Sequence, residues 1–205
     1  MVDETYDGQR RTVAVTLVVA AACWAVAILQ MRGMDMGVDT TLGSFGFFVG
    51  VWAAMMAAMM LPGAVPAVVG YARSHRHVGA AVMFVVAYLA VWTLAGIATY
   101  SIYRPHGAVA AGIVTVAAGL YELTPIKRRA RQRCQERVRS GFHLGLYCLG
   151  STIGLMALLL ALGPMSIAWM SAIALVVLAQ KLARPCPLVD VTLALALIAF
   201  GAATI

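Results

Sequence analysis

The chain has 205 residues, of which 62% are hydrophobic and only 11% are charged, and its mean hydropathy is +0.90. This composition excludes an ordinary soluble domain and indicates an integral membrane protein. The net charge of +7 accompanies long apolar stretches, so we attribute it to basic loops on the inner side of a membrane and expect no nucleic-acid partner.

Seven apolar segments follow one another along the chain, and each is close to the ~20 residues that cross a bilayer. Acidic residues precede the first segment, so we expect a retained helix there rather than a signal peptide. We predict an all-α, polytopic transmembrane bundle that forms one integral membrane domain over residues 1–205. The predicted helices cover approximately residues 13–29, 42–61, 78–100, 107–123, 142–162, 165–182 and 187–205, and the second helix has an alternative end near Tyr71.

The basic residues predict the orientation of this bundle. With the N-terminus inside, 13 of the 15 Lys and Arg residues fall on the inner side, and only Arg32 and Arg104 fall outside. Because cytoplasmic loops are enriched in Lys and Arg, we predict an N-in, C-out protein of the bacterial cytoplasmic (inner) membrane. The inner residues are Arg10, Arg11, Arg73, Arg76, Lys127, Arg128, Arg129, Arg131, Arg133, Arg137, Arg139, Lys181 and Arg184.

Small residues are spaced for close helix contact in the second and fifth predicted helices. Gly46 and Gly50 form one GxxxG pair, and Gly150 and Gly154 form another. Because lipid tails are as apolar as leucine, helices in a bilayer associate largely through such small-residue faces. We therefore expect these two helices at the centre of the bundle, and contacts with other membrane proteins through similar faces.

Four methionines lie within six residues of the second predicted helix, at Met55, Met56, Met59 and Met60. Spacings of three and four residues place them along one side of a helix. A thioether is a soft ligand that suits copper(I) better than zinc, magnesium or iron(II). Methionine also fills irregular gaps between packed helices, so a packing stripe is the alternative interpretation.

The first outer loop contains the stretch "RGMDMGVD", in which Met34 and Met36 flank Asp35. Glycines on either side allow the backbone to turn tightly. Two soft sulfur atoms and a carboxylate in a short loop form a candidate collection point for copper from the outer compartment. The alternative is an ordinary turn whose methionines lie on the membrane surface.

Glu122 and Cys148 are two further candidate ligands, at the inner end of the fourth helix and within the fifth. The pair Thr124–Pro125 predicts the end of the fourth helix, since a residue before proline avoids helical geometry. A carboxylate near the apolar zone is costly and suggests a function, although an ion pair with Lys127 or Arg128 is the alternative. Cys148 lies about 9 Å from the start of its helix. It therefore shares the depth of Met59, Met60 and Glu122, while packing as a small apolar residue is its alternative role.

Several of these stretches together resemble an uncharacterised bacterial family of predicted metal-binding integral membrane proteins, sometimes labelled copper chaperones. The resemblance covers about Gly33 to Lys181. It is carried by "GMDMG", "WAAMMAAMMLP", "YELTPIK", "GLYCLG", the pair Leu155–Met156 and "GPMSIAWM". Membership of this family implies a helical membrane protein that binds metal.

The chain also departs from the pattern of that family at three places. Ala130 stands where a cysteine is common, although Cys134 matches a second cysteine of the pattern. Ser151, Thr152 and Ile153 replace a Cys-Cys-Trp run. The family's Glu-Lys pair appears here as Gln180–Lys181. The methionines are thus retained while several thiols and one carboxylate are lost.

Two interpretations of function remain open. In the first, the protein handles or delivers copper through its methionine-rich helix and loop. In the second, it is a structural or assembly subunit of a larger membrane complex, such as a copper-dependent oxidase or monooxygenase, with no metal of its own. The sequence shows no nucleophile–base pair, HExxH motif or phosphate-binding loop, so we do not expect an independent enzyme.

Overall fold

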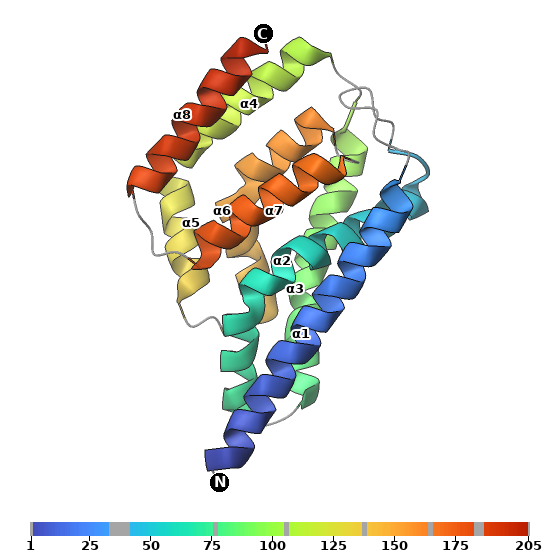
Figure 1. The fold of residues 1–205 in the computed structure, drawn as a ribbon, viewed down its shortest axis with the longest axis vertical. Coiled ribbons are helices and arrows are strands. Elements are labelled where there is room, and N and C mark those ends of the chain that lie inside the picture. The colour runs from blue at the N-terminus through green and yellow to red at the C-terminus, as the bar shows by residue number, and fades with distance from the viewer. Residues whose placement is uncertain are drawn as a thin grey trace.

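The computed structural model describes residues 2–32, 42–75, 78–104, 107–136, 139–163, 166–182 and 187–204, and these residues are almost entirely helical (Figure 1). The prediction of an all-α protein is confirmed. In chain order the helices are α1 (Val2–Met31), α2 (Phe45–His75), α3 (Val78–Ile102), α4 (Ala108–Glu122), α5 (Pro125–Gln135), α6 (Gly141–Leu162), α7 (Ile167–Leu182) and α8 (Pro187–Ala203).

Each of the seven predicted segments corresponds to a helix, and α5 is an additional one. Within the described residues, α1, α2, α3 and α6 are long and apolar enough to cross a membrane. The pair α4 and α5 adds a fifth span if the two helices form one broken segment. Helix α7 and the described part of α8 are apolar but shorter. Seven membrane crossings and the N-in, C-out orientation therefore remain predictions.

The break between α4 and α5 lies where the sequence predicts a helix end. Thr124 is the N-cap of α5, and its hydroxyl accepts a hydrogen bond from the backbone N–H of Lys127 at 3.3 Å. Pro125 occupies the first turn, where its missing N–H costs nothing. The axes of the two helices differ by 63°. Hydropathy does not reveal α5 because its sequence is polar, whereas the capping residues do mark its start.

Helix α2 continues beyond the predicted end at residue 61 and contains Pro62 and Pro66 in its interior. Proline removes a backbone hydrogen bond and clashes with the preceding turn, which bends a helix. Figure 1 shows α2 changing direction part-way along its length. Neighbouring helices therefore meet the two halves of α2 at different angles.

Helices α2 and α6 form the packing centre, as expected, although only the glycines of α6 make the predicted close contacts. The most apolar stretch of each is 61% buried, compared with 33% for α3 and 17% for α1. In α6, a Cβ atom added at Gly141 would lie 1.8 Å from the carbonyl oxygen of Phe84, so α3 and α6 touch through their backbones. By contrast, a Cβ at Gly46 or Gly50 would meet no heavy atom of the described chain within 4 Å. This GxxxG pair is therefore not used in the packing that the structure describes.

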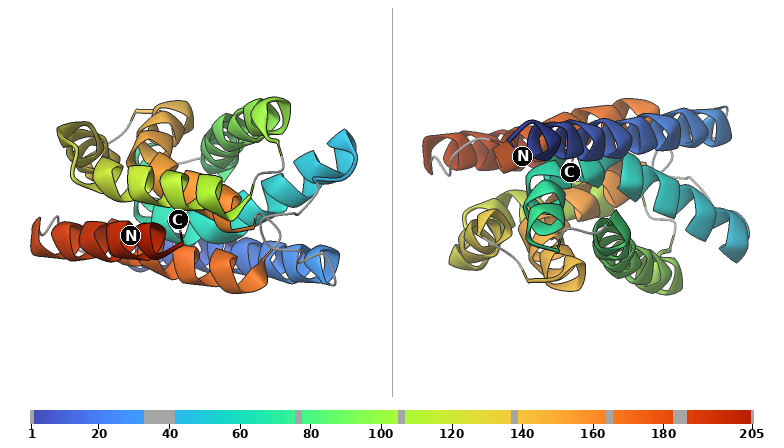
Figure 2. Two further views of the ribbon diagram at one scale, coloured as in Figure 1. Left: turned by 90° about the horizontal axis from the view of Figure 1, so that it is seen from above. Right: turned by 90° about the horizontal axis from the view of Figure 1, so that it is seen from below.

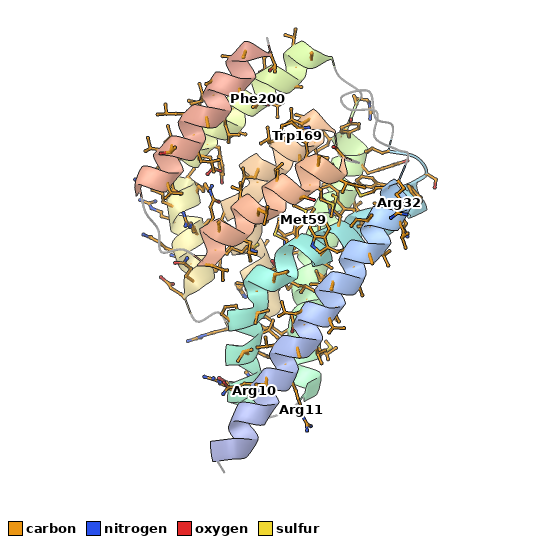
Figure 3. The ribbon with its side chains drawn as sticks, viewed as in Figure 1. Arg10, Arg11, Arg32, Met59, Trp169 and Phe200 are labelled. Carbon is orange, nitrogen blue, oxygen red and sulfur yellow. The ribbon has the colours of Figure 1, made fainter. Side chains whose placement is uncertain are left out.

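The helices are arranged in layers around α2. Figure 2 shows α1, α7 and α8 along one side of the molecule and α3, α5 and α6 along the other. In Figure 3, Arg10 and Arg11 lie near the N-terminal end of α1 and Arg32 lies at its opposite end. The rings of Trp169 and Phe200, 5.8 Å apart between centroids, connect α7 with α8.

Candidate functional site

The methionines of α2 are buried in the core, and one of them contacts a second candidate ligand. Met55, Met56, Met59 and Met60 are each no more than 2% exposed. Figure 3 shows Met59 in the interior, near the crossing of α2 and α7. The Sδ atom of Met60 lies 4.0 Å from the Sγ atom of Cys148 on α6, and Cys148 is itself 1% exposed. The structure thus joins two residues that the sequence placed at the same depth.

A third sulfur atom belongs to Cys134, which lies on α5 and is half-buried. Cys134 lines the same cavity as Cys148. Its Sγ atom also lies 3.9 Å from the hydroxyl oxygen of Ser151, which in turn donates a hydrogen bond to the carbonyl of Cys148 at 2.8 Å. We call Met60, Cys134 and Cys148 the sulfur site, which brings together α2, α5 and α6.

Two polar side chains complete the surroundings of the sulfur site. The hydroxyl oxygen of Tyr88, on α3, lies 3.1 Å from the Sγ atom of Cys148. The ammonium nitrogen of Lys181, on α7, lies 3.3 Å from the Tyr88 hydroxyl oxygen and 3.6 Å from the Sδ atom of Met60. Sequence reasoning did not select Tyr88, Cys134 or Lys181 as site residues. In the sequence, the available signals for these residues were the matches of Cys134 and Lys181 to the family pattern.

A cavity of about 780 Å³ adjoins the sulfur site. Its walls include Gly63 from the second half of α2, Cys134, Cys148 and Lys181. Small-molecule sites commonly have volumes of ~300–1,000 Å³, so this cavity is of a size that holds ligands. The two thiols line the cavity, while Met60 is fully buried next to Cys148. A species inside the cavity would thus meet the thiols.

Glu122 belongs to a separate buried cluster. Its Oε2 atom pairs with the ammonium of Lys127 and accepts a hydrogen bond from the amide of Gln180 at 3.0 Å. The Lys127 ammonium also donates to the Gln180 side-chain oxygen at 3.1 Å. Glu122 and Lys127 are 1% and 2% exposed. The ion-pair interpretation of Glu122 is the one that these contacts support, and a role for Glu122 as a metal ligand stays an untested prediction.

The other predicted ligands have different outcomes. Met34, Asp35 and Met36 lie outside the described residues. Met55 and Met59 lie in the hydrophobic core of the bundle. Among the described residues, no three or more His, Cys, Asp or Glu side chains are grouped so as to hold a metal ion.

The fold and the site define a helical protein in which several helices are long and apolar enough to cross a membrane and in which three sulfur-containing side chains gather beside a cavity. The sequence model of the PpoB2 family, described as a copper chaperone, matches residues 49–204, and the chain belongs to this family. The expected family resemblance is thereby confirmed. The match includes Met60, Tyr88, Cys134, Cys148 and Lys181. No curated protein and no solved structure matches the chain.

Proposed function

We propose that this protein binds copper(I) in the inner membrane and handles or delivers it through the sulfur site. The observation that carries this proposal is the 4.0 Å separation of the Met60 Sδ and Cys148 Sγ atoms, together with Cys134, which lines the same cavity as Cys148. Copper(I) prefers thiolate and thioether ligands, and hard ions such as magnesium prefer oxygen. The description of the family as a copper chaperone supports the same metal.

The spacing of the Met60 and Cys148 sulfur atoms supports coordination of a single ion. A metal–sulfur bond of about 2.3 Å places three sulfur atoms about 4.0 Å apart when they surround one ion in a plane. The Met60–Cys148 separation already has this value, so copper would require little movement of α2 and α6. Access through the cavity would allow the ion to enter or leave by way of the thiols. The loop of Met34, Asp35 and Met36 remains a candidate collection point on the outer side.

The copper content of the purified protein tests this proposal. We expect about one copper(I) per chain after anaerobic loading, and loss of at least tenfold in affinity in C148S and M60L, since each removes one of three ligands. M55L is the matched control, because Met55 is an equally buried methionine of the same helix, whereas Met60 is the one whose sulfur contacts Cys148.

Equal copper affinity in the wild type, C148S and M60L would reject the sulfur site. Equal losses in M55L and M60L would instead assign the metal to the whole methionine stripe of α2.

A second candidate function is that of a structural or assembly subunit in a larger membrane complex. Gly46 and Gly50 of α2 favour it, because both are exposed and no described atom covers their face. Such a small-residue face suits a helix of another membrane protein. Purification in a mild detergent tests this candidate. Isolation of the chain alone, at the size of a monomer, would reject it.

A further inference from the structure

Lys181 brings a positive charge to the sulfur site, and among the described residues no carboxylate forms an ion pair with its ammonium, although Glu136 lines the same cavity. Its ammonium nitrogen lies 3.6 Å from the Met60 Sδ atom and 5.9 Å from the centre of the Tyr88 ring. The ion pairs among the described residues are formed by Lys127 and by Arg131, and Lys181 takes part in neither. A partly buried cation is costly when no opposite charge is near. The position is therefore suited to an anionic group that arrives in the site.

Gly63 leaves the space that the Lys181 side chain occupies beside α2. A Cβ atom at Gly63 would lie 2.3 Å from the Cδ atom of Lys181 and 3.4 Å from its Cβ and Cε atoms. Any larger residue at this position would therefore push the aliphatic part of Lys181 aside. Gly63 directly follows Pro62 in α2. The Lys181 side chain therefore passes this helix next to one of its two prolines.

The net charge of a loaded site depends on Lys181. Cysteine binds metal as a thiolate, so Cys134 and Cys148 would together contribute two negative charges. One copper(I) ion reduces this total to a single negative charge, and the ammonium of Lys181 cancels it. A divalent ion in the same place would leave one positive charge unbalanced. Because an unbalanced charge in a buried site is strongly unfavourable, the balance decides which ion is held more tightly.

We propose that Lys181 makes the sulfur site selective for monovalent over divalent soft metal ions, by supplying the single positive charge that neutralises a monovalent ion bound by two thiolates. This inference rests on the proposed function. The inference goes beyond the proposed function by assigning metal selectivity to a residue that does not need to touch the metal. Gly63 contributes indirectly to this selectivity, since the space beside it holds the Lys181 side chain.

Silver(I) and cadmium(II) are the appropriate probes, because both are soft ions with a filled d shell and they differ in charge. We expect K181M to weaken silver(I) binding about tenfold and to strengthen cadmium(II) binding about tenfold, so the ratio of the two affinities falls about a hundredfold. K181R, which retains the charge, is expected to keep the ratio near that of the wild type. R133M is the charge control, since it removes an exposed cation of α5 that does not line the cavity.

A second variant tests the same idea without removing the lysine. G63A is expected to shift the ratio in the same direction as K181M, because the added methyl group displaces Lys181 from the site. G50A is its control, since a Cβ at Gly50 of the same helix meets nothing within 4 Å.

The outcomes separate the two proposals. If the wild-type protein binds neither silver(I) nor copper(I), the proposed function fails. If it binds them, and K181M and G63A leave the ratio unchanged or weaken both metals by the same factor, the selectivity proposal is overturned while the proposed function stands.

Discussion

Replacement of Glu122 by glutamine is expected to destabilise the protein strongly and to leave copper binding intact. Glu122 and Lys127 are almost completely buried and form an ion pair that Gln180 supports. Glutamine has nearly the same shape as glutamate but carries no charge. The E122Q substitution therefore leaves the ammonium of Lys127 buried without its counter-charge, while the sulfur site keeps all its ligands.

The expected magnitude follows from the burial of the pair. Removing one member of a buried ion pair costs about 3–5 kcal/mol, and two unit charges 4 Å apart interact by about 4 kcal/mol at an effective dielectric constant near 20. Because glutamine can still hydrogen-bond to Gln180, we expect a loss near the lower limit, about 3 kcal/mol in the free energy of unfolding. For a chain of this length, that corresponds to a fall of roughly 6–12 °C in Tm.

Thermal unfolding in detergent micelles, followed by circular dichroism, measures this change, and the copper titration is repeated on the same preparation. The double variant E122Q/K127Q removes both charges and is expected to recover part of the lost stability, since residues in contact do not behave additively. A variant E122Q with the wild-type Tm would refute the assignment of Glu122 to a structural ion pair. Loss of copper at unchanged stability would do the same and would restore Glu122 as a metal ligand.

Two further predictions concern the packing of the helices. G141A is expected to lower Tm by roughly 6–12 °C, the upper part of the range for overpacking, because its methyl group would overlap the backbone of Phe84, whereas G50A should leave Tm unchanged or raise it slightly. Equal effects of the two alanines in thermal unfolding would contradict the close approach of α3 and α6. W52F is expected to cost about 1–3 kcal/mol in unfolding free energy, because it removes the 2.8 Å hydrogen bond from the indole of Trp52 to the carbonyl of Trp92. An unchanged unfolding midpoint in W52F would show that this bond contributes nothing to stability.

The sequence predicted the helices well wherever hydropathy or capping chemistry acts locally. The apolar segments became α1 to α4 and α6 to α8, and Thr124–Pro125 ended α4 as expected. Helix α5 was missed because its polar side chains give no hydropathy signal. The extension of α2 to His75 was left open by Pro62, since a proline bends some helices and ends others.

The sequence predicted that the candidate ligands share one depth, but only the tertiary structure decided which of them meet. Adjacent residues of a helix point about 100° apart, so hydropathy cannot decide whether Met59 or Met60 faces Cys148. That choice depends on how α2 and α6 pack, and the structure selects Met60. Glu122, which the sequence placed at the same depth, pairs instead with Lys127 across the bend between α4 and α5.

Composition, periodicity and motifs were therefore enough to predict a helical protein with apolar, membrane-type segments and its membership of a copper-related family. Each of these features depends on residues close together in the sequence. The grouping of Cys134 with Met60 and Cys148 beside one cavity, and the approach of Lys181 past Gly63, depend on contacts between residues far apart in the sequence. Such contacts arise from the close packing of bent helices. The absence of a Cβ atom at Gly63, for example, leaves room for the side chain of Lys181. For this reason the charge balance of the site could be read only from the folded chain.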